Sequence, residues 1–154
     1  MGWRKHRGGP RGLTDFINHA QEGDVEKQIG QVPGLSEIFK KSNLPLSPVV
    51  KANGFLFVSG LPPYDPKTGN LVQGDIQTQT RAVLDVLKLA LESNGSSLDK
   101  VVKCTVFASN SGFFAQINAI YAQYFAHNPP ARTFVAVGSW PLAFDIEIEC
   151  IALV

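Results

Sequence analysis

The sequence predicts an α+β domain in which two amphipathic helices cover one face of a sheet of about five strands. Two runs rich in β-forming residues flank an Asn-Gly pair at Asn53 and Gly54, which indicates a hairpin. Two stretches with helical periodicity follow, at residues 75–93 and 112–127. Strand-like runs lie between and after them. The predicted order of elements is therefore β-β-α-β-α-β-β.

The first strands follow a proline-rich segment. Residues 42–48 (SNLPLSP) contain two prolines, which disfavour a helix and favour an extended path. The hairpin VVKANGFLFVSG comes next, and its second strand runs from Phe55 to Ser59 and ends at Gly60. A loop with three prolines follows at residues 61–71.

The two helices each show one apolar side. In the first, this side consists of Ile76, Val83, Val86, Leu87, Ala90 and Leu91, and Asn94-Gly95 ends the helix. In the second, it consists of Phe114, Ile117, Tyr121, Tyr124 and Phe125. Asn118 lies on the same stripe, and a buried amide must find hydrogen-bond partners. We expect Asn118 to tie down a neighbouring loop, with a direct role in chemistry as the alternative.

The remaining strands carry alternating side chains. Between the helices, residues 100–109 place Val102, Cys104, Val106 and Ala108 on one face. The last strand places Phe144, Ile146, Ile148, Cys150 and Ala152 on one face, and its other face carries Asp145, Glu147, Glu149, Ile151 and Leu153. The second face of the sheet is thus partly apolar, and oligomerisation is the economical way to cover it.

Composition limits the classes of function. The chain has 154 residues, 44% of them hydrophobic, which suits one domain, predicted over residues 31–154. Residues 1–30 are predicted to be a partly disordered extension, with a short helix possible over residues 13–29. This extension contains four basic residues, Arg4, Lys5, Arg7 and Arg11. We interpret it as a solvated arm, with a contact to nucleic acid as the alternative. The rest has ten basic and thirteen acidic side chains, a net charge of −3, so we expect no nucleic-acid partner.

The cysteines and histidines suggest no metal site. Cys104 and Cys150 each lie in an apolar run without a CxxC partner, which indicates buried structural thiols in a reducing compartment. The three histidines are scattered, so we expect no metal. No secretory signal and no apolar run long enough to cross a bilayer is found, and we expect a cytoplasmic protein with no membrane partner.

The candidate site lies at the end of the chain. Arg132 stands where a proline-stiffened turn becomes a strand, and Glu147 lies on the strand that returns. An arginine fork grips a planar carboxylate with two parallel hydrogen bonds, and a glutamate can orient a water. The structural alternatives are a solvated ion pair for Arg132 and a surface carboxylate for Glu147, because Glu149 lies on the same face.

The chain resembles the reactive-intermediate deaminase family, also called the YjgF type, over roughly residues 42–154. The resemblance rests on SG after the hairpin, QTR on the first helix, INAIYAQYF, PPARTFVAVG and IEIECIAL. It implies a chorismate-mutase-like subunit that forms a homotrimer with three clefts at the subunit boundaries. It also implies hydrolysis of enamines and imines such as 2-aminoacrylate to ammonia and a 2-keto acid, without a metal or organic cofactor.

Individual residues carry the resemblance to the site. Arg132 matches the arginine that binds the substrate carboxylate, and Glu147 matches the acid that positions the attacking water. Ser59 and Gly60 match the segment that lines the cleft, and Asn118 matches an asparagine associated with it. Two positions depart from the pattern. Leu46 replaces a common tyrosine, and Phe134 replaces a common cysteine. The segment around Leu46 resembles that of the aminoacrylate deaminases of pyrimidine breakdown. A relation to 2-aminomuconate deaminases is a further possibility.

The chemistry needs only modest catalysis. An imine of a 2-keto acid carries a carboxylate beside the carbon that water attacks, so one clamp and one base need to lower the barrier by only roughly a few kcal/mol. The main rival is a non-catalytic protein that binds or senses keto acids in the same cleft, because a fold hosts several roles. A ribonuclease activity has little support, because the domain has no basic stripe with interleaved aromatic residues.

Overall fold

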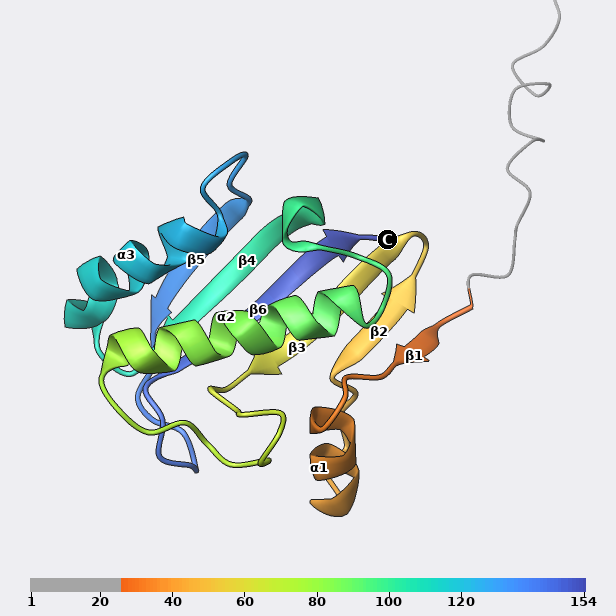
Figure 1. Ribbon diagram of the computed structural model, residues 1–154, viewed down its shortest axis with the longest axis horizontal. Helices are drawn as coiled ribbons and strands as arrows, with labels where there is room; N and C mark the ends of the chain where they lie inside the picture. Colours follow the sequence, from red (N-terminus) through yellow and green to blue (C-terminus); the bar gives the residue numbers. More distant parts are fainter. Residues whose placement is uncertain (1–25) are drawn as a thin grey trace, which may run out of the picture.

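Two helices, α2 (Ile76–Glu92) and α3 (Phe114–Tyr124), cover one face of a six-stranded sheet in the computed structural model of the chain (Figure 1). The structure describes residues 26–154. The sheet has the order β1-β2-β3-β6-β4-β5, and every neighbouring pair is antiparallel except β4 and β5, which are parallel. The strands are β1 (Gln28–Gly30), β2 (Val49–Ala52), β3 (Phe55–Leu61), β4 (Val101–Ala108), β5 (Ala131–Ala136) and β6 (Ile146–Leu153). The α+β prediction is confirmed.

Two elements precede those that the sequence predicted. Strand β1 pairs with β2 at the edge of the sheet, and helix α1 (Leu35–Lys41) buries Leu35 and Phe39, one turn apart, on one side. The helix predicted over residues 13–29 is wrong at its end, because Gln28 and Ile29 form a strand that hydrogen-bonds to β2. The rest of that helix and the basic arm lie outside the described residues. Strand β1 thus lies before the predicted boundary at residue 31.

The hairpin between β2 and β3 is the predicted one. Asn53 and Gly54 have φ values of 54° and 78°, and the flanking residues Ala52 and Phe55 are paired. Two successive residues with positive φ give a turn whose twist matches that of the strands. The Asn-Gly pair therefore sets the register that brings Ser59 and Gly60 to the far end of β3.

Helix α2 agrees with its prediction, and helix α3 is shorter than predicted. The Asp75 carboxylate caps α2 by accepting a 2.8 Å hydrogen bond from the Thr78 N–H, which lowers the pKa of Asp75. A short 3-10 turn, η3 (Ser111–Phe113), precedes α3. Phe114 then begins α3 and is 45% exposed, so the prediction that it is buried is wrong. Its ring packs instead on Phe134, at the edge strand of the sheet.

An irregularity in β4 breaks the predicted alternation of this strand. Val101 pairs with Ala152 and Lys103 with Ile151, so Val102 is an extra residue, which is the arrangement of a β-bulge. Val101 is buried like Cys104 and Val102 is exposed, so the prediction that Val102 shares the face of Cys104 is wrong. A second short turn, η2 (Leu98–Lys100), leads directly into this bulge. Beyond it Cys104 is buried as predicted.

The core lies between the helices and one face of the sheet. Cys104 and Cys150 are buried free thiols at paired positions of β4 and β6, which confirms their predicted burial. The opposite face exposes Phe55, Phe57 and Leu153, which confirms its mixed character. Within residues 26–154, no helix is long and apolar enough to cross a membrane.

Candidate functional site

The sheet order separates the strands that carry Arg132 and Glu147. Arg132 lies on β5, whose only sheet neighbour among the described strands is β4, and Glu147 lies on β6, on the other side of β4. Arg132 is level with Cys104 of β4, whereas Glu147 is level with Phe107. The strand with Glu147 therefore does not return beside the strand with Arg132, as the sequence suggested, because β5 runs parallel to β4 and only β4 contacts both.

Arg132 and Glu147 also project from opposite faces of the sheet. Arg132 shares the helix-covered face with its register partner Cys104, which is buried. Glu147 lies between Ile146 and Ile148, both buried beneath the helices, so its side chain points to the open face. Two strand spacings and three residues of offset place the two backbones about 14 Å apart. One chain alone does not bring this pair together.

The surroundings of Arg132 form the first half of the site. A hollow of about 420 Å³ is lined by Asn118, Tyr121, Ala122, Phe125, Pro129, Pro130 and Arg132. The guanidinium lies 4.7 Å from the centre of the Tyr121 ring and 5.7 Å from that of Phe114. It forms no ion pair with any described residue, so the structural alternative for Arg132 is not observed. Its hydrogen-bond donors remain available for an anion.

Asn118 lies in the same hollow as Arg132. Its side chain is half-buried and forms no hydrogen bond with another residue in the part of the chain that the structure describes. The expected contact with a neighbouring loop is thus not formed there, and the amide faces the hollow with both donor and acceptor free. Phe134, which occupies the position of the common cysteine, packs edge-on against Phe114 at 5.1 Å.

The ring of Tyr121 packs against the guanidinium of Arg132. The side chain is buried, and its hydroxyl has no hydrogen-bond partner among residues 26–154. Burial is the main cause that raises the pKa of Tyr121, and the neighbouring Cys104 thiol adds to it. The phenol therefore stays neutral, and its ring offers Arg132 a flat, apolar surface.

Glu147 lies in a second hollow, of about 220 Å³, near the N-terminal end of β6. Its lining is mainly apolar, with Phe39, Leu44, Leu46, Gly60, Pro62, Tyr64, Trp140, Pro141, Leu142, Phe144 and Glu147. A Cβ on Gly60 would overlap the Oε1 atom of Glu147, so only glycine leaves room for the carboxylate here. Burial, and next the charge of Glu149, raise the pKa of Glu147, while hydrogen bonding to Trp140 opposes this shift.

Ser59 holds the segment that carries Leu46. Its hydroxyl donates a 2.7 Å hydrogen bond to the carbonyl of Ser47, and its N–H donates to the carbonyl of Pro48 at 3.0 Å. The register of β3 shifts between Val58 and Leu61, beside Gly60. Gly60 lies in the hollow of Glu147, whereas the Ser59 hydroxyl donates its proton to the Ser47 carbonyl and Ser59 does not line that hollow.

A polar network that sequence reasoning did not identify anchors the start of β6. The Asp145 carboxylate accepts hydrogen bonds from Ser109 Oγ at 2.7 Å and from Gln79 Nε2 at 3.1 Å. Gln79 Oε1 in turn accepts from the Asp145 N–H at 2.8 Å. Gln79 is buried on α2, so its polar side chain on an apolar helix face was the available signal. This network fixes the strand two residues before Glu147.

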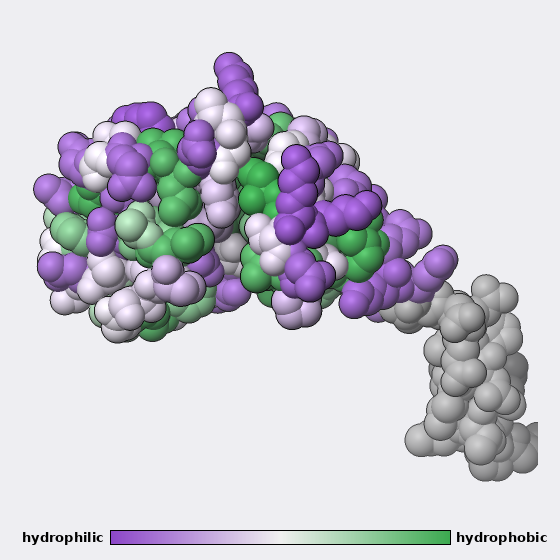
Figure 2. Space-filling view, turned by 90° about the horizontal axis from the view of Figure 1, so that it is seen from below, coloured by the Kyte–Doolittle hydropathy of each residue, from purple (hydrophilic) through white to green (hydrophobic). Residues whose placement is uncertain are grey.

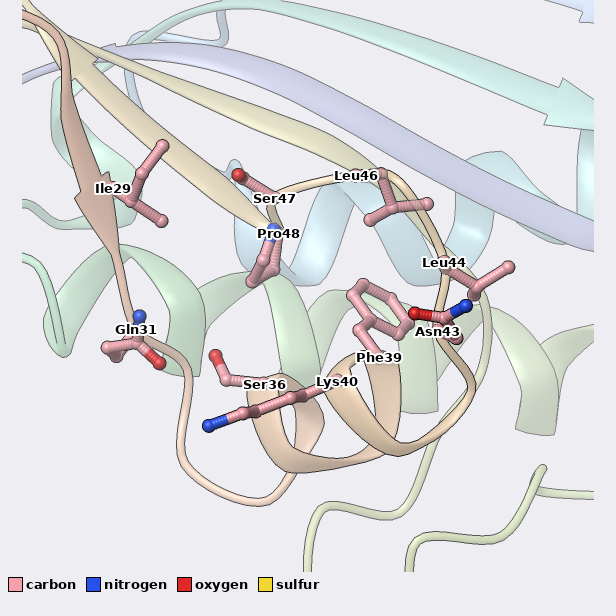
Figure 3. Close-up of a pocket in the computed structure, with 10 residues that line it drawn as sticks. All are labelled: Ile29, Gln31, Ser36, Phe39, Lys40, Asn43, Leu44, Leu46, Ser47 and Pro48. Carbon is pink, nitrogen blue, oxygen red and sulfur yellow. The ribbon is translucent and has the colours of Figure 1, made fainter.

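Trp140 and Tyr64 were also not identified, because they come from loops whose course the sequence does not specify. Phe144 was predicted on the last strand, but it lies in the loop before β6, which begins at Ile146. Figure 2 views the molecule from the end where these loops lie and shows apolar residues exposed in its middle part. Figure 3 shows an adjoining hollow of about 320 Å³ that shares three residues with the Glu147 hollow, namely Phe39, Leu44 and Leu46. Helix α1 and the loop after it thus form a wall of the Glu147 hollow.

Comparison with known proteins identifies the family. The family model described as Endoribonuclease L-PSP matches residues 37–154, which is most of the chain and includes both hollows. The chain belongs to this family. The match begins within α1, so strand β1 precedes it.

Several relatives resemble the chain closely. A RutC family protein of Pyrococcus horikoshii is 48% identical over 108 residues, which make up 70% of this chain and 86% of that protein. The chloroplastic Reactive Intermediate Deaminase A of Arabidopsis thaliana is 39% identical over 108 residues, 70% of this chain and 58% of that protein. The crystal structure of a putative endoribonuclease from Thermotoga maritima superimposes with a TM-score of 0.76 at 42% identity, over 84% of this chain and 98% of that one. These similarities confirm both the resemblance and the fold.

Proposed function

We propose that this chain is a hydrolytic deaminase of enamines and imines of 2-keto acids, of the 2-aminoacrylate type. The observation that carries the proposal is that Arg132 and Glu147 lie in two separate hollows, each of which forms half of a site. Arg132 has a guanidinium without an ion-pair partner among the described residues, and Glu147 is a carboxylate with a raised pKa in an apolar hollow. A carboxylate clamp and a base are the two groups that this hydrolysis requires.

The two half-sites complete each other in an assembly of several copies. Because Arg132 and Glu147 face opposite sides of one sheet, the Arg132 half of one copy must meet the Glu147 half of another. A heterologous contact of this kind closes into a ring, and the proposed ring is a homotrimer. The exposed Phe55, Phe57 and Leu153 on the open face support it, since contact between copies removes this apolar surface from water.

Each residue then has a separate task. Arg132 holds the substrate carboxylate through two parallel hydrogen bonds and so fixes the plane of the imine. Asn118, free in the same hollow, is placed to bind a polar atom of the substrate. Glu147 accepts a proton from water as the oxygen attacks the imine carbon, and this proton passes to the nitrogen to give a carbinolamine. The hydroxyl of the carbinolamine then gives up its proton, which also passes to the nitrogen, as the C–N bond breaks, so that the keto acid forms and ammonia leaves. The raised pKa makes Glu147 a better proton acceptor than an exposed carboxylate.

The family relationship supports a deaminase in particular. One relative is named Reactive Intermediate Deaminase and is 39% identical over 70% of this chain, and the family model matches the region of both hollows. A keto acid binding or sensing protein is the alternative, favoured by Leu46 and Phe134, which leave the cleft without a hydroxyl and a thiol that relatives commonly have. A 2-aminomuconate-type substrate is a second alternative within the deaminase class.

Ammonia release distinguishes the enzyme from the sensor. Freshly generated 2-aminoacrylate decays by itself, so the rate is compared with and without the protein, and with bovine serum albumin at equal concentration. We expect the protein to accelerate the release of ammonia and pyruvate. Binding of pyruvate in calorimetry without any acceleration would favour the sensor and refute the proposal.

A further inference from the structure

We infer that the cleft selects imines whose carbon substituent is large and apolar, such as those formed by oxidation of leucine or phenylalanine, over imines with a methyl group. The inference rests on the proposed function and concerns the wall of the Glu147 hollow. It assigns a binding role for the substrate side chain to Leu46, Trp140 and Phe144.

The wall consists of apolar side chains that are open to solvent. Leu44, Leu46 and Leu142 are 47%, 45% and 51% exposed and are among the most exposed large apolar residues described. All three line the one hollow that also holds Glu147. Exposed apolar residues scattered singly need no explanation, but a cluster beside a candidate base indicates a surface that a ligand covers.

Aromatic rings give this wall a defined shape. Trp140 and Phe144 pack at 4.7 Å between ring centres, and Phe39 and Tyr64 form an edge-on pair at 6.5 Å. Rings in such pairs lose little conformational freedom when a ligand binds, because each already has a fixed neighbour. The wall is therefore suited to a rigid or branched apolar group.

The wall is anchored at three separate places. The Ser59 hydroxyl holds the carbonyl of Ser47, next to Leu46. The hydrogen bonds of Asp145 to Gln79 and Ser109 hold the residue that follows Phe144. Phe39 is buried in the core from helix α1. A surface held in place by buried contacts on both sides is a preformed pocket, and a preformed pocket discriminates by size.

The size of the hollow agrees with a large substituent. Its volume of about 220 Å³ is several times the roughly 30 Å³ that one water molecule occupies in the liquid. A methyl group would leave most of this space to water in contact with apolar walls. An isobutyl or benzyl group would displace that water, which is the favourable exchange.

The expected selectivity follows from the apolar surface of the substrate that binding removes from water. Each buried methylene contributes about fourfold in kcat/KM, and an isobutyl group has three more carbons than a methyl group. Because the hollow is open on one side, we expect about a tenfold preference for the leucine-derived imine over the alanine-derived imine.

The test measures kcat/KM for a series of imines made in place by an amino acid oxidase from alanine, leucine and phenylalanine. Wild-type protein is compared with Leu46→Ala, which trims the wall, and with Ile29→Ala. Ile29 is exposed and lines only the adjoining hollow (Figure 3), so it is the matched control. We expect the leucine-to-alanine ratio to be about ten in the wild type and in Ile29→Ala, and to fall severalfold in Leu46→Ala.

Calorimetry with the corresponding keto acids distinguishes failure of the proposed deaminase function from failure of the proposed selectivity for large apolar substituents. If no imine is hydrolysed, the proposed function fails, and the affinities for pyruvate and 4-methyl-2-oxopentanoate still test the wall. Tighter binding of the larger acid, weakened by Leu46→Ala, would support the inference in that case. Equal rates for all imines in an active enzyme, or equal affinities in an inactive one, would overturn it.

Discussion

Arg132 and Glu147 project from opposite faces of the same sheet, with strand β4 between the strands that carry them. Within one chain the charge of Arg132 therefore does not stabilise the Glu147 carboxylate. This separation allows Glu147 to keep a raised pKa in its apolar hollow and allows Arg132 to remain without an ion-pair partner among the described residues.

Substitution of Arg132 tests the carboxylate clamp. Lysine keeps the charge but loses the planar fork, so the imine carbon is free to swing, and we expect a loss on the order of a hundredfold in kcat/KM. Alanine removes the charge as well, and deamination should fall to the spontaneous rate while the assembly stays intact. Steady-state rates on 2-aminoacrylate, together with light scattering, measure both effects. Near-normal activity in both variants would exclude the clamp.

Replacement of Glu147 by glutamine tests the base. Wild-type kcat/KM should fall as the pH drops through the raised pKa of Glu147, because only the ionised carboxylate accepts a proton. Glu147→Gln should be slow at every pH, without this acidic limb, and should still bind pyruvate. An acidic limb that persists in Glu147→Gln would assign it to another group.

Glu147→Gln should lower activity but raise the stability of the folded protein near neutral pH. A carboxyl with a raised folded pKa favours folding below its unfolded value, ordinarily 4.5, and this contribution is lost as the pH rises through the folded pKa. Glu147→Gln should therefore have a higher Tm than the wild type near neutral pH, and the difference should shrink below pH 4.5. Thermal unfolding by circular dichroism at both pH values measures it. A lower Tm at neutral pH would show that the carboxylate is stabilised instead.

A methyl group at Gly60 tests the position of Glu147. The added Cβ would overlap Oε1, so the carboxylate must turn away, and we expect kcat to fall about tenfold or more. Gly138→Ala is the matched control, because a Cβ there meets no atom within 4 Å. Comparison of kcat and Tm for both variants separates displacement of the base from general damage. Equal kcat in both variants would mean that this position of Glu147 is not used.

Two substitutions of Tyr121 test its support of Arg132. Phenylalanine removes a buried hydroxyl without a partner and keeps the ring, so stability should rise slightly or stay unchanged and activity should persist. Leucine removes the ring over which the guanidinium lies, worth about 0.5–2 kcal/mol, and should raise KM for the substrate. Equal KM values for the two variants, determined from initial rates, would argue against this support.

The sequence predicts those parts of the fold that depend on local patterns. The Asn53–Gly54 turn, the apolar face of α2 and the alternation along β6 each follow from near neighbours in the chain, and the structure confirms them. Strand β1 was not predicted, because three residues at a sheet edge depend on pairing with β2 and leave no periodic pattern. The bulge at Val102 was not predicted, because it depends on the register with β6.

The candidate site is predictable in its residue types but not in its arrangement. Arg132 and Glu147 were identified from their places at strand positions and from the family motifs. Their opposite faces depend on β6 lying beside β3 and β4, which is a long-range property of the sheet. The aromatic residues Tyr64 and Trp140 come from loops without a regular pattern, so only their packing reveals them. Phe144 continues the alternation of β6 in the sequence, but the strand begins only at Ile146.

Complementation between two inactive variants tests most directly that the site is shared between copies. Arg132→Ala and Glu147→Gln are co-expressed with different tags, the mixed assemblies are isolated, and their mass is checked by light scattering for the proposed trimer. In every mixed trimer, whichever variant is in excess, one of the three contacts joins an intact Arg132 to an intact Glu147, which is about a third of the sites. The mixed assemblies should therefore recover about a third of wild-type activity on 2-aminoacrylate, although each variant alone is nearly inactive. Mixed trimers no more active than either variant alone would contradict a shared site.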